Sequence, residues 1–241
     1  RDWLLTFSTP LLLVLAFPKA DVWILSWFAF IPLFVCLNNT QKFSDAVLKA
    51  YVSGFLFFLA TLYWLVHVTL PGMILMVAYL SLFFGIFGAV YWWAQRYNFL
   101  VRLFFLPSAW VVLEFVRAHF LTGFSWSTLG YSQYKNLLMI QIADLTGVYG
   151  VSFLIILVNY WLHEVVRQQV IDKKLNTEKE FVYAGLIVVG LLVAVIGYGF
   201  WSRQEATPAD RSKVAVIQGN IPLELKWSKA AWPLILEKYL L

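Results

Sequence analysis

Two long apolar stretches, at residues 73–94 and 181–201, constrain the fold of this chain more than any other feature of its sequence. Neither stretch contains a charged residue or a proline. As helices rising about 1.5 Å per residue, both would cross the roughly 30 Å hydrocarbon core of a lipid bilayer. An uninterrupted helix satisfies its own backbone hydrogen bonds, as lipid requires. Both stretches therefore predict membrane-spanning helices.

Five further apolar stretches extend this pattern, at residues 3–17, 22–37, 46–66, 103–120 and 137–162. The first two contain 15 and 16 residues and would reach only about 23–24 Å as helices. They are therefore expected either as complete spans or as the two arms of a shallow hairpin. Pro10 and Pro32 lie inside them and are expected to kink each helix.

The composition agrees with a membrane protein. Hydrophobic residues make up 61% of the chain and charged residues only 13%, against about 45–50% and about 25% in ordinary soluble domains. A water-soluble fold of this size could not bury so much apolar surface. The sequence thus predicts an all-α polytopic membrane protein with about seven transmembrane helices.

The distribution of lysine and arginine predicts the orientation, because cytoplasmic loops carry the excess of these residues. If every stretch spans, one alternate set of connections holds nine basic residues and the other holds three. The larger set comprises Arg1, Lys42, Lys49, Arg96, Arg102, Arg167, Lys173, Lys174 and Lys179, and the smaller set Lys19, Arg117 and Lys135. The amino terminus is therefore expected on the cytoplasmic side of a bacterial inner membrane, and the segment after residue 201 in the periplasm.

The composition changes after residue 201. Residues 202–212 are polar and include one proline, which is typical of a linker between domains. Residues 213–220 combine a β-branched apolar run with a glycine turn, the pattern of a buried strand. A helix capped by Ser228 is expected over residues 229–241. Its apolar face comprises Trp232, Ile235, Leu236 and Tyr239.

One buried strand cannot stand alone, because its backbone groups need neighbouring strands and only about 20 residues follow it. We therefore expect a transmembrane domain at residues 1–201, a linker at 202–212, and the truncated start of an α/β domain at 213–241. On this interpretation Leu241 is a truncation point rather than the end of a folded domain.

Two clusters of motifs connect the sequence to a known family. The first comprises Leu-Thr-Gly-Phe-Ser-Trp at residues 121–126, Gly-Tyr-Ser-Gln at 130–133 and Ala-Asp-Leu-Thr-Gly-Val-Tyr-Gly-Val-Ser-Phe at 143–153. The second comprises Val-Ala-Val-Ile-Gln-Gly-Asn-Ile-Pro at 214–222, followed by Lys226 and Trp227. With these motifs at this spacing, the chain resembles apolipoprotein N-acyltransferase over essentially its whole length.

The resemblance implies a membrane domain followed by an extracytoplasmic nitrilase-like (carbon–nitrogen hydrolase) domain. It also implies transfer of an acyl chain from a phospholipid to the amino-terminal diacylglyceryl-cysteine of a lipoprotein, through a thioester on a cysteine. In the family a glutamate activates this thiol and a lysine stabilises the oxyanion. No residue here matches these three, so we predict no catalytic residue in this chain and no activity from it alone. Cys36 lies in the membrane domain, and Glu224 and Glu237 precede the position expected for the glutamate.

The resemblance implies substrate-binding roles for Trp227 and Gly123. Trp227 matches a tryptophan that the family places near its active site, where an indole can pack against acyl chains and keep its N–H at the wet boundary. An anchor at the membrane surface is an equally good interpretation. Gly123 matches a functionally important glycine of the family, and the simpler interpretation is a turn glycine.

Trp126, Tyr131 and Gln133 follow in the same expected outward loop. We predict that all three line a lipid cleft and bind substrate. An interfacial belt of aromatic residues explains Trp126 and Tyr131 equally well.

Two pairs of polar residues near the ends of spans are expected to be structural. Glu114 and Arg117 lie three residues apart, so they share one helix face and are expected to pair. Ionisable residues at membrane depth are also candidates for function, but both lie near the interface. Asp144 with Gln141 is a similar case.

The sequence favours no cofactor and no metal site. The histidines are scattered, and His163-Glu164 lacks the second histidine of a zinc-protease motif. The single Cys36 excludes an internal disulfide. The net charge of +5 lies mainly in the expected cytoplasmic loops, which favours membrane lipids over nucleic acid as partners. The resemblance adds a phospholipid acyl donor and a diacylglyceryl lipoprotein acceptor.

Two other functions stay open. The chain could be a non-catalytic membrane anchor or scaffold related to the family, for example one associated with a glycosyltransferase that acts on polyprenol lipids. A small-molecule transporter would show paired intramembrane charges or broken helices in corresponding halves. The absence of an internal repeat from the sequence disfavours a transporter.

Overall fold

A computed structural model describes residues 2–121, 123–171, 179–204 and 214–240. It divides into two compact units, Arg1–Glu205 and Ala206–Leu241. Within the described ranges every regular element is helical. This result confirms the all-α membrane fold that the apolar stretches predict.

Five helices in the described part of the chain are long and apolar enough to cross a membrane. They are α3 (Phe43–Thr61), α4 (Leu70–Ala94), α5 (Phe99–His119), α6 (Ala143–Val166) and α7 (Lys179–Gln204). Short 3-10 turns accompany two of them, namely η2 (Tyr63–His67) after α3 and η4 (Met139–Ile142) before α6. A π-helical turn, η5 (Arg167–Ile171), extends α6. The start of α5 is set by Asn98, whose side chain accepts a hydrogen bond from the backbone N–H of Val101 at 2.9 Å.

The two short apolar stretches form shorter helices. The first is α1 (Asp2–Ala16), with Pro10 inside it. The second is interrupted, and consists of the 3-10 turn η1 (Trp23–Trp27) and the helix α2 (Ile31–Asn38). Pro32 was expected to kink a helix, but it lies in the first turn of α2. There its missing N–H removes no helical hydrogen bond, so the chain breaks before the proline instead of bending at it.

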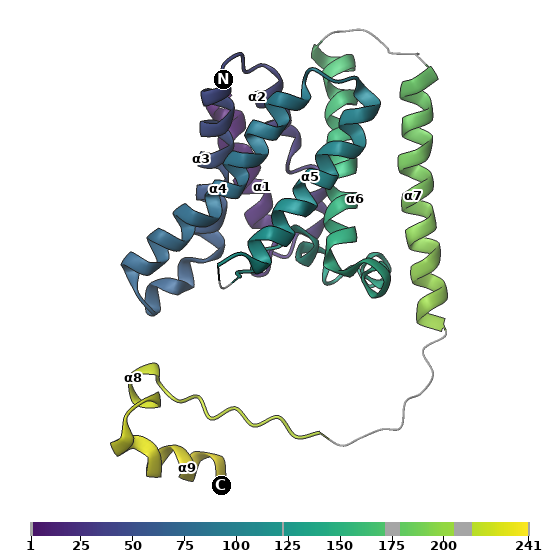
Figure 1. The fold of residues 1–241 in the computed structure, drawn as a ribbon. Coiled ribbons are helices and arrows are strands. Elements are labelled where there is room, and N and C mark those ends of the chain that lie inside the picture. The colour runs from purple at the N-terminus through teal and green to yellow at the C-terminus, as the bar shows by residue number, and fades with distance from the viewer. Residues whose placement is uncertain (1, 122, 172–178, 205–213, 241) are drawn as a thin grey trace. The chain divides into compact units, whose positions relative to one another are not determined.

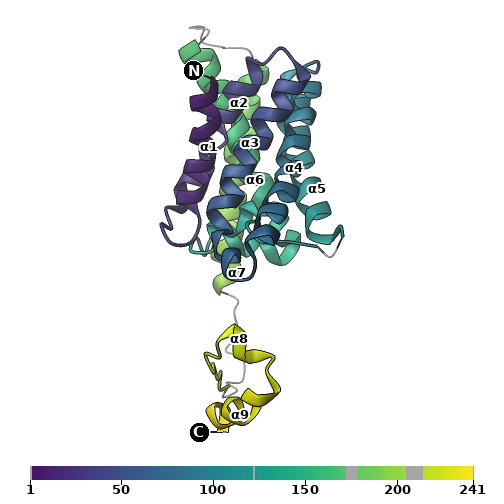
Figure 2. The ribbon, with the colours of Figure 1, turned by 90° about the vertical axis from the view of Figure 1, so that its left-hand side faces the viewer.

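The connections between helices gather at two opposite ends of the first unit (Figures 1 and 2). At one end Lys49 forms an ion pair with Asp2 at 3.0 Å. At the other end Lys135 forms an ion pair with Asp21 at 2.6 Å. The two sets of connections thus alternate along the chain as the charge pattern requires. Which end faces outward stays a prediction.

The helices α3 and α4 pack closely against each other. A side chain added at Gly88 would lie 2.6 Å from the carbonyl oxygen of Ala46, so glycine is needed for this approach. Next to it, the Trp110 ring on α5 packs edge-on against Phe30 and Phe84, with centroids 4.8 and 5.0 Å away. These contacts fix α3, α4 and α5 around the interrupted segment.

A buried charged cluster lies at the end of the bundle that carries Asp2 and Lys49. Glu164 on α6 is fully buried. Its carboxylate accepts hydrogen bonds from Arg167 at 2.7 Å and from the Tyr160 hydroxyl at 2.9 Å. Arg102 on α5 lies 3.9 Å away. Donors therefore surround the charge, as burial requires, and the cluster joins α5 to α6.

The second unit contains α8 (Leu223–Lys226), η6 (Lys229–Ala231) and α9 (Trp232–Leu240). The helix expected after Ser228 is present as η6 and α9, although the Ser228 side chain makes no capping hydrogen bond. Residues 214–222 have no regular secondary structure, so the strand expected at 213–220 is not formed over its described part. A strand needs a neighbour for its backbone groups, and the described part of this unit offers none. The domain boundaries at 201 and 213 stay predictions.

Candidate functional site

A groove of about 560 Å³ lies at the end of the first unit that carries Lys135 and Asp21. Its walls come from the end of α1, the end of α3 and the loop that follows α5. The lining side chains that matter most below are Lys19, Ala60, Tyr63, Trp64, Trp126 and Tyr131. This volume is within the range of small-molecule pockets, about 300–1,000 Å³.

Two of the predicted substrate-binding residues, Trp126 and Tyr131, line this groove together. Both side chains are exposed. The Trp126 ring lies 5.1 Å from the Trp64 ring between centroids. Exposed aromatic rings beside an apolar wall suit the boundary between lipid and water. Their part in substrate binding stays a prediction.

Gln133, predicted in the same cleft, is fully buried and is bonded to protein atoms. Its Oε1 accepts a hydrogen bond from Trp27 Nε1 at 3.1 Å. Its Nε2 donates to Ser26 Oγ at 2.8 Å and to the Trp23 carbonyl at 3.0 Å. Gln133 thus ties the loop after α5 to η1, and the structure does not bring its side chain to the groove.

Asn159 on α6 extends this network, and the sequence analysis did not single it out. The side chain is fully buried. Its Oδ1 accepts from the backbone N–H of Phe30 at 2.8 Å, and its Nδ2 donates to the Ser26 carbonyl at 2.8 Å. These bonds satisfy the backbone where η1 gives way to α2. The sequence feature that could have singled out Asn159 is an amide side chain in the middle of an apolar span.

Gly123 lies in the turn after α5, away from the groove. Its φ is +73°, and an added Cβ would lie 2.1 Å from the carbonyl oxygen of Ala118. Both features require glycine. Gly123 also lines a separate cavity of about 270 Å³, together with Leu75 and Tyr79 of α4. The turn itself therefore accounts for this glycine, and its role in binding stays a prediction.

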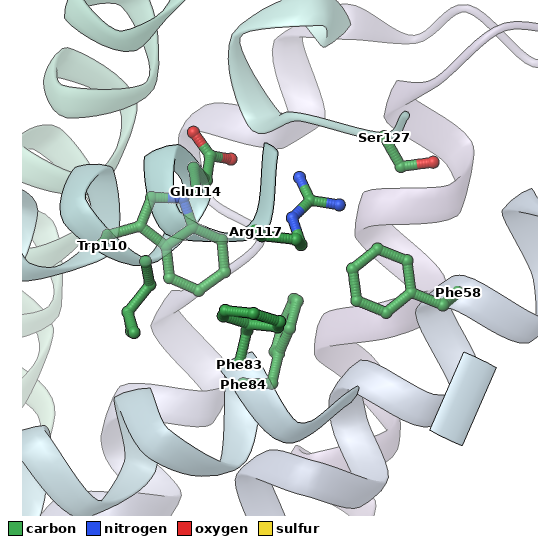
Figure 3. Close-up of a pocket in the computed structure, with 8 residues that line it drawn as sticks. Phe58, Phe83, Phe84, Trp110, Glu114, Arg117 and Ser127 are labelled. Carbon is green, nitrogen blue, oxygen red and sulfur yellow. The ribbon is translucent and has the colours of Figure 1, made fainter. Parts of the chain in front are cut away.

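Glu114 and Arg117 are both buried near the end of α5, but each bonds to the following loop and not to its expected partner. Arg117 donates to the Trp126 carbonyl at 2.8 Å and to Thr128 Oγ1 at 3.2 Å. Glu114 Oε1 accepts from the backbone N–H of Leu129 at 2.7 Å. Figure 3 shows the two side chains extending from α5, with the Arg117 guanidinium between Glu114 and the Phe58 ring.

These bonds fix the backbone that carries Trp126 into the groove wall. Ser127, the next residue, has a φ of +59°, which is uncommon for a residue with a side chain. Its hydroxyl donates to Thr61 Oγ1 at 3.2 Å, which joins the loop to the end of α3. The position of Trp126 therefore depends on α3 as well as on α5.

A cavity of about 10 Å³ lies beside Glu114 and Arg117 (Figure 3). The rings of Phe58, Phe84 and Trp110 enclose it. It is far below the size of a substrate pocket. The 560 Å³ groove is therefore the better candidate for a substrate site.

The rim of the groove carries charged and phenolic groups. Asp21 accepts hydrogen bonds from Lys135 at 2.6 Å and from the Tyr134 hydroxyl at 2.8 Å. These two hydrogen bonds hold the pKa of the Asp21 carboxyl below its ordinary value. Lys19 donates to the Tyr63 hydroxyl, and its Nζ lies 4.2 Å from the centre of the Tyr63 ring.

The remaining predicted residues lie elsewhere. Trp227 belongs to the second unit, where its side chain is exposed. Asp144 accepts a hydrogen bond from the Tyr198 hydroxyl at 2.6 Å, and Gln141 accepts one from Ser202 at 3.4 Å. The last two contacts join the start of α6 and the turn before it to α7, which agrees with the structural role expected for both residues.

Two aliphatic hydroxyls line the groove, Ser127 Oγ and Thr61 Oγ1, and they are bonded to each other. Three tyrosines, Tyr63, Tyr131 and Tyr134, and one charged side chain, Lys19, also line it among the described residues. An apolar chain and a polar end group are the ligand features that its walls and rim can accommodate.

Comparison with known proteins identifies the kind of domain that this bundle resembles. Residues 10–161 match the family model described as apolipoprotein N-acyltransferase N-terminal domain. The chain is 34% identical over 238 residues to a Geobacter metallireducens protein named apolipoprotein N-acyltransferase. It is 31% identical over 239 residues to a Chlorobaculum tepidum protein of the same name.

These alignments cover 94% of this chain in both cases. They cover only 45% of the Geobacter metallireducens protein and 43% of the Chlorobaculum tepidum protein. The chain thus spans less than half the length of the curated relatives it matches. The groove and the Glu114 and Arg117 contacts lie within or next to the residues matched by the family model.

Proposed function

This chain belongs to the apolipoprotein N-acyltransferase family, and from that premise we propose that it is the membrane domain of such an enzyme. The reaction moves an acyl chain from a phospholipid to the amino-terminal diacylglyceryl-cysteine of a lipoprotein. The observation that carries the proposal is the family match over residues 10–161, which covers most of the helical bundle and the loop that forms the groove wall. As a member of this family the chain is a multi-pass membrane protein.

We assign the chemistry to the nitrilase-like domain that the resemblance to the family implies. In the first step a cysteine thiolate attacks the ester carbonyl of the phospholipid, forming a thioester and releasing the lysophospholipid as alcohol. In the second step the amine of the lipoprotein attacks the thioester, forming an amide and returning the thiol. A glutamate takes the thiol proton, and a lysine stabilises the oxyanion of each tetrahedral intermediate. Residues 213–241 are proposed as the first part of the nitrilase-like domain that supplies these groups.

In this proposal the groove binds the lipid substrate, while the nitrilase-like domain carries out the reaction. Trp126 and Tyr131 present exposed rings next to an apolar wall, a surface suited to holding a lipid at the membrane boundary. The charge pattern predicts that this end faces the periplasm. The proposal places the groove, Trp227 and the nitrilase-like domain on that side, with the amino terminus in the cytoplasm.

The test is an N-acylation assay in lipid vesicles. The 241-residue chain and the reading frame extended past Leu241 are each supplied with phospholipid and a diacylglyceryl-modified lipopeptide. Mass spectrometry of the peptide amine should detect an added acyl group only with the extended chain. Acylation by the 241-residue chain alone would contradict the placement of the chemistry. A stoichiometric partner that purifies with a non-acylating extended chain would favour the scaffold function.

The groove is tested in the extended chain. Trp126→Ala and Tyr131→Ala should each raise the KM for the phospholipid, because both remove a lining ring. Trp93→Ala is the matched control, since Trp93 is also an exposed tryptophan but does not line the groove. Equal kinetics for all three variants and the unmodified chain would exclude the groove as the lipid site.

A further inference from the structure

Lys19 is a cation without a carboxylate partner at the mouth of the groove. Its Nζ contacts the hydroxyl and ring of Tyr63, and among the described residues no acidic group lies within ion-pair distance of it. The other basic residues predicted on this side are accounted for, because Lys135 pairs with Asp21 and Arg117 is buried against the loop. An unneutralised charge beside an apolar groove indicates an anionic ligand group.

The backbone at Lys19 adds a second argument. Its φ is +104°, a region that residues with a side chain rarely adopt and that glycine occupies without cost. A lysine held in this conformation is strained. The turn alone would favour glycine here, so the side chain itself is the feature to explain.

The walls of the groove specify what the anion is attached to. Val14, Leu15 and Phe17 of the α1 end and Ala60 of α3 line it, and none of these side chains offers a polar group. The Trp64 and Trp126 rings, whose centroids are 5.1 Å apart, also line it. An apolar chain fits against such walls, while a free anion or a polar peptide gains nothing from them.

We propose that the groove binds a glycerophospholipid, with the lipid phosphate at Lys19 Nζ and one acyl chain along Val14, Leu15 and Ala60. The ammonium has three donors, so it can keep its bond to Tyr63 and still donate to phosphate oxygens. Lys19 is then the residue that recognises the headgroup. This inference rests on the proposed function only in taking the bound lipid as the acyl donor.

The test measures lipid binding by the 241-residue chain in detergent. Phosphatidylglycerol with brominated acyl chains is titrated, and the part of the tryptophan quenching that is lost in Trp126→Phe reports a chain in the groove. Brominated diacylglycerol, which lacks the phosphate, is titrated in parallel. Lys19→Ala should weaken phosphatidylglycerol binding about fivefold or more and leave diacylglycerol binding unchanged. Lys19→Arg should retain the affinity for phosphatidylglycerol.

Two matched variants separate this site from general effects. Arg96→Ala removes an exposed cation that does not line the groove, so it should leave binding unchanged. Ala60→Phe fills the groove and should weaken the binding of both lipids. Equal binding by Lys19→Ala and the unmodified chain would overturn the proposal. So would an equal loss in Arg96→Ala, or full displacement of the lipid by glycerol phosphate at matched concentration.

The outcome is separable from that of the proposed function. If Lys19→Ala loses phospholipid binding while the extended chain acylates no peptide, the headgroup site stands and the enzymatic function fails. If the extended chain is active and Lys19→Ala leaves its KM for phospholipid unchanged, the function stands and the headgroup site fails.

Discussion

At the scale of single residues, the loop contacts of Glu114 and Arg117 are the main departure from expectation. Their spacing predicts a mutual pair, since residues three apart share a helix face. Sequence spacing says nothing of the backbone groups at residues 126–129 that fold back over the helix end. Those groups offer each charge a partner of its own.

Trp126 and Tyr131 could be placed at one site from the sequence, because they share one short loop. The burial of Gln133 could not be predicted in this way, because it depends on η1, more than 100 residues away in sequence.

Arg117→Ala should destabilise the bundle by about 3 kcal/mol, because it removes two charge-assisted hydrogen bonds and leaves Glu114 buried without a nearby cation. Arg117→Lys should recover part of this loss. The measurement is thermal unfolding in detergent, combined with limited proteolysis of residues 121–137. Arg96→Ala, at an exposed arginine, is the control and should leave both unchanged. An intact loop in Arg117→Ala would show that its contacts do not hold Trp126.

Gly123→Ala should lower the unfolding free energy by about 1–3 kcal/mol, because alanine at this positive φ is strained and its Cβ would meet the Ala118 carbonyl. Gly190→Ala is the matched control, since nothing lies within 4 Å of an added Cβ there and alanine favours a helix. Thermal unfolding of the two variants under identical detergent conditions makes the comparison. Equal unfolding free energies for the two variants would show that the turn accommodates alanine at residue 123 without losing stability.

The ion pair at the groove rim should be measurable as a pH effect. Lys135 and Tyr134 hold the pKa of Asp21 below its ordinary value. The contacts of Asp21 therefore stabilise the folded state fully at pH values above the ordinary pKa near 3.8. This stabilisation is lost as the pH falls through the lowered pKa of the folded state. A carbon NMR titration of Asp21 measures that pKa. Lys135→Ala should raise it towards the ordinary value. An unchanged titration in the variant would remove Lys135 as the cause.

At the scale of elements, apolar length predicted the five long helices, and their ends followed from local signals such as Asn98 before α5. The interruption between η1 and α2 was not predictable in this way. It depends on Asn159, and on Thr9, which accepts a hydrogen bond from the backbone N–H of Leu33 at 3.1 Å. Both partners are remote in sequence, and hydropathy contains no information on such pairings.

Asn159→Leu should destabilise the bundle by about 1–3 kcal/mol, because the Phe30 N–H and the Ser26 carbonyl lose a buried partner. The expected reading is a lower unfolding temperature in detergent together with faster amide exchange at residues 28–33. Asn39→Ala, at an exposed asparagine that ends α2, serves for comparison. Unaltered exchange in Asn159→Leu would mean that the interruption needs no cap from α6.

At the scale of the whole molecule, the alternation of spans and the family match agree on a polytopic membrane domain. The segment at 213–220 shows the limit of pattern reading. Its residues favour a strand, yet over the described part no strand forms, because strand formation depends on partners elsewhere in a chain and not on the segment alone.

Orientation is a property of the whole chain and can be tested directly. Cys36→Ala provides a cysteine-free background, into which single cysteines are placed at residue 175 or at residue 66. A membrane-impermeant maleimide added to intact cells should label residue 66 and not residue 175. The excess of lysine and arginine predicts that the loop containing residue 175 lies in the cytoplasm. Labelling of residue 175 from outside would reverse the proposed topology.

The hydrogen-bond network around Gln133 has a consequence for how the neighbouring groove accepts a ligand. This network joins three separate parts of the chain, namely Ser26 with Trp27, Gln133, and Asn159, so the segment that carries Tyr131 is already held in place when a ligand arrives. Ligand binding then costs the protein little conformational entropy. The rate of ligand entry should therefore depend on how quickly a molecule leaves the surrounding bilayer or micelle, and exchange rates should follow the fluidity of that medium more closely than substitutions in this network.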